Sequence, residues 1–497
     1  MDTIRHWING ALVDSKSGRR GDVFNPATGE VQKQVDLASE PEVDTAVAAA
    51  KKALESWQHA SLATRTRVLF AYRELVNRHK DEIARMLTLE HGKVLSDAQG
   101  EVQRGLEVVE YACGLSDLLK GEISENVSTE VDSYSLRQPV GVVAGITPFN
   151  FPAMVPMWMY PIALACGNTF VLKPSERDPS VTAFCAELLQ KAGLPDGVFN
   201  VVHGDKVAVD RLLGHPDVGA VSFVGSTPIA KYIYENGTKN GKRVQALGGA
   251  KNHMVVLPDA DMDLAADAAV GAGYGSAGER CMAIAVLVTV GNAADKLLPK
   301  IRERIAALKV GNGLDPASQM GPLITRQHME KVSGYIASGA QEGAELIVDG
   351  RTLKVPGHEN GFFVGPTLLD RVRPGMTCYQ EEIFGPVLSV VRVATYEEAI
   401  RLIHEHHYGN GTAIFTNDGG AARKFRHEIQ IGMVGINVPI PVPMSYYSFG
   451  GWKQSLFGDL HIYGPDGVRF YTRNKVVIER WPDPRFRGVD LGFPQNR

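Results

Sequence analysis

The sequence of 497 residues predicts an α/β protein with two units, each built on a largely parallel, doubly wound sheet. Two observations lead to this fold class. From Val140 to about residue 226, short runs of β-branched residues alternate with helical segments, and such alternation is typical of parallel sheets. A second alternating series extends from about residue 283 to about residue 440. The length agrees with two or three structural units, because it exceeds what one ordinary hydrophobic core contains.

The amino-terminal part predicts short strands and then a helix. Turn signals in "INGALV" and "FNPATGE" separate strands within the first 35 residues or so. A helix is expected after Ser39, with Pro41 in its first turn and apolar residues at helical spacing beyond it.

Two more helical regions and a ribbon are expected before the first alternating series. The second helical region covers residues 64–92. The third begins at "SDAQ", where Ser96 and Gln99 have the spacing of a capping box. Residues 122–137 alternate like an exposed strand but are polar on both faces, which predicts a ribbon that projects from the core or pairs with another subunit.

Composition and charge exclude several classes of function. The chain is 44% hydrophobic and 22% charged, and its net charge of −4 gives no nucleic-acid footprint. No stretch approaches the roughly 20 apolar residues of a membrane helix, and the amino terminus has no apolar signal segment. The five cysteines are scattered and lack zinc spacing. We therefore expect a cytoplasmic protein without a metal site and without nucleic-acid or membrane partners.

Polar residues follow several of the predicted strands. Lys173, Glu176, Gly225 and Ser226 fall at carboxyl ends of strands, which is where doubly wound sheets bind ligands. The amides after "VSFVGST" would suit phosphate oxygens, although an ordinary strand–helix turn explains this pattern equally well. The literal G-x-G-x-x-G string in residues 273–278 follows a helical segment instead of a strand, so we do not interpret it as a dinucleotide motif.

One cysteine stands in an unusual setting. Cys281 follows the glycine-rich segment "GSAGER", and glycine there lets backbone approach a reactive centre. The usual role of a free cysteine is that of a small buried hydrophobe. Neighbouring positive charge, here from Arg280, lowers a thiol pKa and favours a nucleophile. The pattern by itself leaves both interpretations open.

Seven motifs in a fixed order resemble the NAD(P)-dependent aldehyde dehydrogenase family over nearly the whole chain. They are "TPFNFP" (147–152), "LKPSE" (172–176), "FVGST" (223–227), "LGGAKNH" (247–253), "GERC" (278–281), "EEIFGPV" (381–387) and "FGGWKQS" (449–455). The resemblance implies a Rossmann-like NAD-binding domain in residues 1–121 and 141–250 and an α/β catalytic domain in 251–465. It also implies a β-ribbon oligomerisation element in 122–140 and 466–497, which would assemble a homodimer or homotetramer.

The resemblance further implies roles for individual residues. Cys281 matches the nucleophile, and Asn150 matches the side chain that stabilises the oxyanion together with the Cys281 amide. Glu176 at a strand end suits a ribose 2′-hydroxyl better than a 2′-phosphate, so NAD is the expected cofactor. The residues that match cofactor contacts are Thr147, Phe149, Lys173, Glu176, Arg177, Ser226, Gly248, Glu382 and Phe384.

One departure from the family pattern bears on the fate of the thioester. Hydrolytic members carry a glutamate directly before Leu-Gly-Gly, and this chain has Ala246 there. A methyl group cannot accept a proton from water. This departure and "GERC" resemble the CoA-acylating methylmalonate-semialdehyde dehydrogenases, in which the thiol of coenzyme A takes the acyl group. A thiol needs less help from a base than water does, because its thiolate is accessible near neutral pH.

The subgroup implies acidic semialdehydes as substrates. The expected reaction is the NAD-dependent, CoA-acylating oxidation and decarboxylation of methylmalonate semialdehyde to propionyl-CoA, and of malonate semialdehyde to acetyl-CoA. Arg280 and Arg104 match residues that hold the substrate carboxylate, a task suited to guanidinium groups. Arg104 could instead form a surface ion pair with Glu101 or Glu107. A hydrolytic dehydrogenase of another acidic semialdehyde and a non-catalytic relative are the alternatives.

Overall fold

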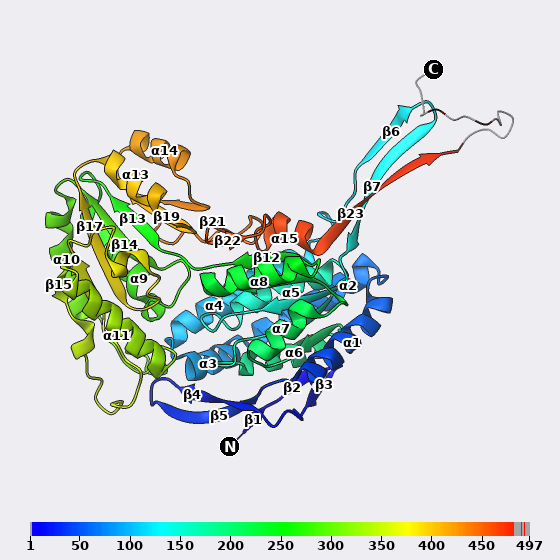
Figure 1. Ribbon diagram of the computed structural model, residues 1–497, viewed down its shortest axis with the longest axis horizontal. Coiled ribbons are helices and arrows are strands. Elements are labelled where there is room, and N and C mark those ends of the chain that lie inside the picture. The colour runs from blue at the N-terminus through cyan, green and yellow to red at the C-terminus, as the bar shows by residue number, and fades with distance from the viewer. Residues whose placement is uncertain (1, 482–488, 490–491, 493–497) are drawn as a thin grey trace.

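The computed structural model describes residues 2–481, 489 and 492, and it has the two expected α/β units (Figure 1). The first unit contains an eight-stranded sheet whose five central strands are parallel and whose edge strands are antiparallel. In spatial order its strands are β22 (Leu456–Phe457), β12 (Arg243–Leu247), β11 (Val218–Val224), β8 (Val142–Ile146), β9 (Thr169–Lys173), β10 (Phe199–Val201), β2 (His6–Ile8) and β3 (Ala11–Val13).

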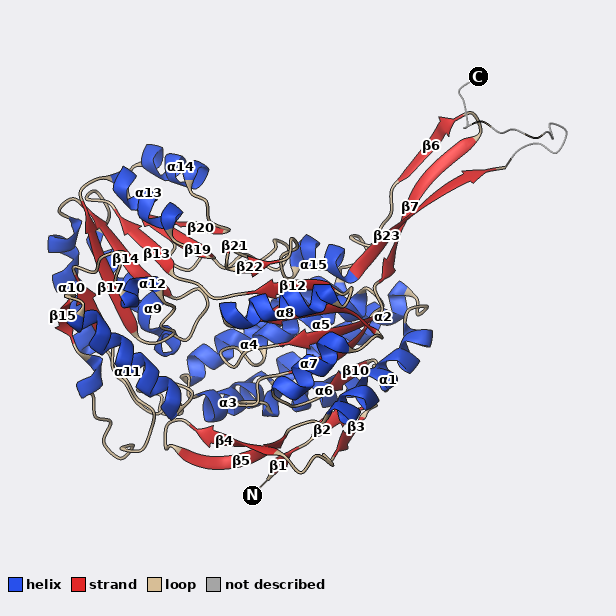
Figure 2. Cartoon of the chain, viewed as in Figure 1, coloured by secondary structure: helices blue, strands red, loops and turns tan. Residues whose placement is uncertain are grey.

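Helices cover both faces of this sheet, as Figure 2 shows, because its central strands are apolar on both sides. One face packs against α1 (Glu40–Trp57), α7 (Lys206–Gly214) and α8 (Thr227–Lys239). The other packs against α2 (Leu62–Arg78), α4 (Leu95–Cys113), α5 (Met154–Ala165) and α6 (Ser180–Lys191), with α3 (Lys80–His91) beside α4. A small sheet of β1 (Thr3–Ile4), β5 (Glu30–Asp36) and β4 (Arg20–Asn25) lies at the amino terminus.

The second unit has a seven-stranded sheet that is parallel except for its edge strand β15. Its order is β15 (Glu345–Val348), β16 (Thr367–Asp370), β17 (Val387–Val393), β14 (Ile284–Val290), β13 (Asn252–Val256), β19 (Gly411–Phe415) and β20 (Met433–Ile436). Its helices are α9 (Met262–Tyr274), α10 (Ala293–Ala307), α11 (Arg326–Gln341), α12 (Thr377–Gln380), α13 (Tyr396–Glu405) and α14 (Gly419–Glu428), with short 3₁₀ turns at Gly275–Gly278 and Gly350–Thr352.

Two predicted helix starts have different outcomes. The start of α1 is confirmed: Ser39 is the N-cap, and its backbone N–H donates to the Glu42 carboxylate at 2.7 Å. The capping box at Ser96 is wrong, because α4 already begins at Leu95 and has Val94 as its N-cap. The Gln99 side chain instead donates to Asp81 of α3 at 2.9 Å, so it joins two helices and caps neither.

The ribbon predicted at residues 122–137 projects from the body of the protein (Figure 1). It consists of β6 (Ile123–Ser128) and β7 (Val131–Pro139), and β7 pairs along its whole length with β23 (Thr472–Arg480). Several of its apolar side chains are solvent-exposed, among them Ile123, Val476 and Ile478. Most of the tail after residue 481, which the sequence assigned to the same element, lies outside the described residues.

The carboxyl-terminal segment returns to the first unit before it enters the ribbon. There β22 pairs with β12, and α15 (Gly464–Tyr471) packs on α5. Just before β22, β21 (Trp452–Lys453) pairs with β18 (Tyr408–Gly409) of the second unit. Among the described helices, none combines the length and the apolar character needed to cross a membrane.

The two units meet in close backbone contacts. The chain crosses from β12 to β13 through residues 248–251. A Cβ on Gly321 would lie 2.0 Å from the Gly92 carbonyl oxygen, and the Leu95 N–H donates to the Gly313 oxygen at 3.0 Å. Glycine is needed at these positions because any side chain would force the units apart.

Candidate active site

Two cavities meet at Cys281. A groove of about 730 Å³ runs between the units, within the range of small-molecule sites, and a second cavity has about 240 Å³. Among the described residues, Cys281 alone lines both. Its side chain is partly accessible, whereas the other four cysteines are buried. The thiol can therefore be approached from two sides, which favours a nucleophilic role over simple packing.

The loop that carries Cys281 is tightly constrained. It follows α9 and passes through Ser276 and Ala277, both at φ 52°, in the left-handed region that non-glycine residues seldom adopt. A Cβ on Gly278 would lie 2.2 Å from the Gly385 oxygen, which explains the glycine before "ERC". Such local strain is typical of functional sites.

Side-chain amides also hold the backbone of this loop. The Cys281 carbonyl oxygen accepts hydrogen bonds from Asn252 at 2.9 Å and from Asn410 at 3.1 Å. Asn252 is the first residue of β13, and Asn410 directly precedes β19. The amino ends of these two parallel strands therefore hold the backbone of the nucleophile in position.

Burial raises the pKa of the Cys281 thiol to about 12, and the charge of Glu382 acts in the same direction. Arg280 lowers this pKa, as its neighbouring charge predicts, but its effect is smaller. The thiol is therefore protonated in the ligand-free protein. Arg280 itself is held by Asp97: Nη2 of Arg280 donates to Oδ1 of Asp97 at 2.6 Å.

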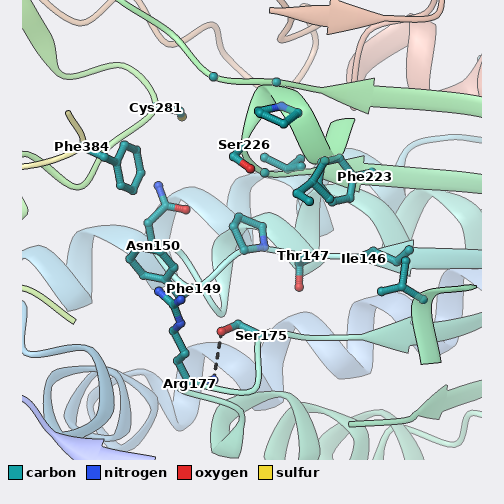
Figure 3. Close-up of a pocket in the computed structure, with 18 of the residues that line it drawn as sticks. Ile146, Thr147, Phe149, Asn150, Ser175, Arg177, Phe223, Ser226, Cys281 and Phe384 are labelled. Carbon is teal, nitrogen blue, oxygen red and sulfur yellow. Dashed lines mark hydrogen bonds between the residues drawn. The ribbon is translucent and has the colours of Figure 1, made fainter. Parts of the chain in front are cut away.

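Asn150 lies in the same groove as the thiol. It is buried in the segment that follows β8, and Figure 3 shows its amide and the ring of Phe384 beneath Cys281. This segment contains "TPFNFP", so the structure brings together the two motifs expected to form an oxyanion site.

The remaining groove brings together every residue expected to contact NAD: Thr147, Phe149, Lys173, Glu176, Arg177, Ser226, Gly248, Glu382 and Phe384. Lys173 Nζ lies 3.1 Å from a Glu176 carboxylate oxygen. Burial opposes ionisation of Glu176, but the Lys173 charge and hydrogen bonds outweigh it and lower the carboxyl pKa. An ionised carboxylate at the end of β9 can accept hydrogen bonds from ribose hydroxyls. Arg177 stacks on the Phe149 ring, 5.1 Å from its centre.

Unpaired polar groups in this groove fit a dinucleotide. The Thr147 hydroxyl is buried without a hydrogen-bond partner. Ser226 is the N-cap of α8, and the start of this helix lines the groove, an arrangement that suits phosphate oxygens. A Cβ on Gly249 would lie 2.3 Å from a Glu382 oxygen, so glycine lets this carboxylate reach the crossing between the units.

Glu382 is itself held in place at this crossing. It accepts the Ala250 N–H at 2.8 Å. Burial raises its carboxyl pKa to about 7, so this group changes charge near neutral pH.

Several other groove residues carry no signal in the sequence. His328 and Lys331 come from α11, and Lys206 and Tyr232 come from α7 and α8. The His328 ring contacts the Phe384 carbonyl oxygen at 2.7 Å, and Phe384 has φ 56°. None of these side chains belongs to a recognisable motif. They could not be found from the sequence, because only the packing of the helices brings them to the groove.

The smaller cavity contains both predicted arginines. Both arginines line it together with Cys281. The acids Asp97 and Glu101 and apolar residues such as Trp158 and Phe449 also belong to its wall. Arg104 also pairs with Glu107 at 2.8 Å, so the ion pair considered above is present as well. Asp97, the partner of Arg280, could not be predicted from the sequence, because 183 positions separate the two residues. A cavity that combines guanidinium groups with an apolar wall suits a short acid.

Ala246 lies on β12 and is fully buried in the core of the first unit. It lines neither the groove nor the smaller cavity. The position before Leu-Gly-Gly therefore supplies no base to the thiol.

Comparison with known proteins identifies the family. The model of the aldehyde dehydrogenase family matches residues 12–477. The chain belongs to this family. Solved aldehyde dehydrogenase structures share the fold, so the expected combination of a Rossmann-like domain and an α/β catalytic domain is confirmed.

Two curated relatives of this aldehyde dehydrogenase have closely related names. The malonate-semialdehyde dehydrogenase of Pseudomonas aeruginosa is 60% identical over 483 residues and covers 97% of each chain. The acylating methylmalonate-semialdehyde/malonate-semialdehyde dehydrogenase of Rattus norvegicus is 50% identical, over 97% of this chain and 90% of the relative.

Two solved structures are similarly close. The methylmalonate-semialdehyde dehydrogenase of Oceanimonas doudoroffii has a TM-score of 0.96 at 62% identity, over 98% of this chain and 100% of the other. A Sinorhizobium meliloti 1021 protein complexed with NAD has a TM-score of 0.96 at 54% identity, over 97% and 99% of the two chains.

The site geometry predicts the effect of two substitutions on turnover. Cys281→Ala should abolish NADH formation and leave NAD binding nearly intact, because the thiol forms only one small part of the groove wall. Asn150→Ala should lower the rate by about 10²–10³, the usual loss for one oxyanion donor. Steady-state kinetics and NAD titration check both. Turnover of Cys281→Ala within about tenfold of wild type would exclude a nucleophilic cysteine.

A second prediction concerns the pH dependence of the free thiol. Since its pKa is raised to about 12, alkylation of Cys281 by iodoacetamide should rise about tenfold per pH unit between pH 8 and pH 10. The thiolate fraction increases tenfold per unit below the pKa. Mass spectrometry of the labelled peptide measures the rate, with Cys281→Ala as the control. A rate that is already constant above pH 8 would contradict a raised pKa.

Proposed function

We propose that this aldehyde dehydrogenase catalyses the NAD-dependent, CoA-acylating oxidation and decarboxylation of methylmalonate semialdehyde to propionyl-CoA, and of malonate semialdehyde to acetyl-CoA. The observation that carries the proposal is the position of Cys281 between a dinucleotide-sized groove and a small cavity with two arginines. The names of the relatives from Pseudomonas aeruginosa and Rattus norvegicus support the same substrates.

The first steps take place at Cys281. The thiol gives its proton to water, and the sulfur then attacks the aldehyde carbon to form a tetrahedral adduct. The side-chain amide of Asn150 and the backbone N–H of Cys281 stabilise the negative oxygen of this adduct. The groove residues would hold NAD, whose nicotinamide ring would supply the acceptor for the hydride that leaves the former aldehyde carbon. The acyl group then remains on Cys281 as a thioester.

The substrate carboxylate has to leave bulk water to bring the aldehyde to Cys281. Arg280 and Arg104 would supply the charged hydrogen bonds that a buried carboxylate needs. Carbon dioxide departs from the carbon next to the thioester carbonyl, and the electrons pass into an enolate whose oxygen the Asn150 site can support. A proton then replaces the lost carboxylate.

The thiolate of coenzyme A completes the reaction by displacing Cys281 from the thioester. This transfer needs no strong base, which agrees with the methyl group at Ala246. The alternative is a dehydrogenase that hydrolyses its thioester with another base. Glu382 would be the acid available for that role, because it lines the groove and its pKa of about 7 allows it to exchange a proton near neutral pH.

We further propose that the chain forms a homodimer or homotetramer through the ribbon of β6, β7 and β23. The exposed apolar side chains on this ribbon support that assembly. Residues 1–121 and 141–250 would bind NAD, and residues 251–465 would carry the catalytic thiol. A cytoplasmic location agrees with free thiols at all five cysteines.

Product analysis with and without CoA tests the acyl transfer. With methylmalonate semialdehyde, NAD and CoA, propionyl-CoA and carbon dioxide should form in equal amounts. Without CoA, we expect a burst of about one NADH per active site and then slow turnover. The thioester should persist, because Ala246 stands where hydrolytic members have the glutamate that activates water. Rapid mixing with absorbance detection measures the burst. Release of free acid at the CoA-supplemented rate would favour the hydrolytic alternative.

A matched pair of substrates tests the arginines. Arg280→Ala or Arg104→Ala should lower kcat/KM for methylmalonate semialdehyde by about 10–150-fold, since a hydrogen bond to a charged group contributes roughly 1.5–3 kcal/mol. The loss should be much smaller for propanal, which has no carboxylate. Equal losses for both substrates would mean that the arginines act on the nucleophile or on the fold.

A further inference from the structure

A charged pair is fully buried beneath the segment that carries Asn150. The side chains of Lys93 and Glu101 have no solvent exposure, and Lys93 Nζ lies 2.6 Å from a Glu101 oxygen. Removing two charges from water is unfavourable unless hydrogen bonds satisfy both groups. The partners of this pair therefore indicate what it does.

Each member of the pair binds a different end of one short segment. Lys93 Nζ also donates to the Asn150 backbone carbonyl at 2.6 Å, and it lies 4.4 Å from the centre of the Phe151 ring. The second oxygen of Glu101 accepts the N–H groups of Ala153 at 2.9 Å and Met154 at 3.1 Å. These amides begin α5, which has no capping side chain of its own. The pair thus fixes both ends of residues 150–154.

Lys93 is also anchored to the other unit. It lies between α3 and α4, directly after Gly92, and a Cβ on Gly313 would lie 2.4 Å from the Lys93 carbonyl oxygen. Gly313 belongs to the second unit, which also carries Cys281. The Lys93 backbone therefore packs on the unit of the nucleophile while its side chain holds the segment of the oxyanion donor.

We infer that Lys93, paired with Glu101, is a positioning residue that sets the place of Asn150 relative to Cys281. This inference rests on the role proposed for Asn150. Lys93 lines neither the groove nor the smaller cavity, so it acts through Asn150 and not by touching a ligand. Glu101 does line the smaller cavity, which makes Lys93 the cleaner residue to test.

A double-mutant cycle of Lys93→Met and Asn150→Ala tests the inference in the full-length enzyme. Lys93→Met should lower kcat by about 10–100-fold, because a misplacement of about 1 Å can cost 10²-fold, while the Kd of NAD stays within about twofold. In the Asn150→Ala background the same change should lower kcat by less than about twofold, since no amide is left to position. If Lys93→Met does not give folded protein, Lys93→Gln replaces it in the cycle.

Lys242→Met is the matched control. Lys242 is another buried lysine that donates to backbone carbonyls, those of His215 and Val218, but it lies at the opposite end of β11 from the groove. Its kcat should stay within about twofold of wild type, even if thermal unfolding occurs at a lower temperature.

The outcomes distinguish the positioning role of Lys93 from the oxyanion role of Asn150. A full-sized loss from Lys93→Met in the Asn150→Ala background, or no loss in the wild type, would overturn the positioning role. A nearly normal kcat of Asn150→Ala alone would instead overturn the oxyanion role of Asn150, and the Lys93 inference would fall with it.

Discussion

The arrangement of this protein depends on one constraint: a single thiol must be shielded from bulk water and still be reached by two ligands at once. Two sheets satisfy it: the carboxyl ends of strands in the first sheet meet the amino ends of strands in the second, so that Cys281 of one unit faces Asn150 of the other. Backbone is packed so closely around the site that Gly278 cannot carry a side chain against Gly385, and Gly321 cannot carry one against Gly92 of the other unit. Shielding also keeps the thiol protonated, because burial raises its pKa.

Buried lysines are a consequence of the same arrangement, and hydrogen bonds hold two of them near the site. Burial lowers the pKa of Lys251 to about 8, yet its ammonium group donates to the carbonyl oxygens of Cys378 and Glu381 and so fixes the loop of Glu382. Lys93 does the same for the loop of Asn150. Each loop presents a functional side chain to the groove, Asn150 or Glu382. Each is held by a buried lysine that does not line the groove. Positioning by buried polar networks is expected where geometry has to be kept within fractions of an ångström.

Most of the fold and the ligand-facing residues could be predicted from the sequence, because local patterns and ordered motifs determine them. Strands β8, β9 and β11 are short apolar runs that end in polar residues, and those ends line the groove. The supporting contacts could not be predicted. Arg280 meets Asp97 across 183 positions, and His328 enters the groove from a helix without a motif. At Ser96 the local pattern was misleading, since the interhelical bond of Gln99 to Asp81 takes the place of a cap.

The separation of the two cavities has a consequence for how such a protein can change over evolutionary time. Cys281 is the one described residue common to both, so a substitution elsewhere in the wall of the smaller cavity changes no residue that lines the dinucleotide groove. Substitution of Arg104 or Trp158 during evolution could change which aldehyde is bound, while the residues that contact the cofactor stay the same. Contacts that support both sides, such as Glu101, which lines the smaller cavity and also holds the start of α5, would be the slowest to diverge.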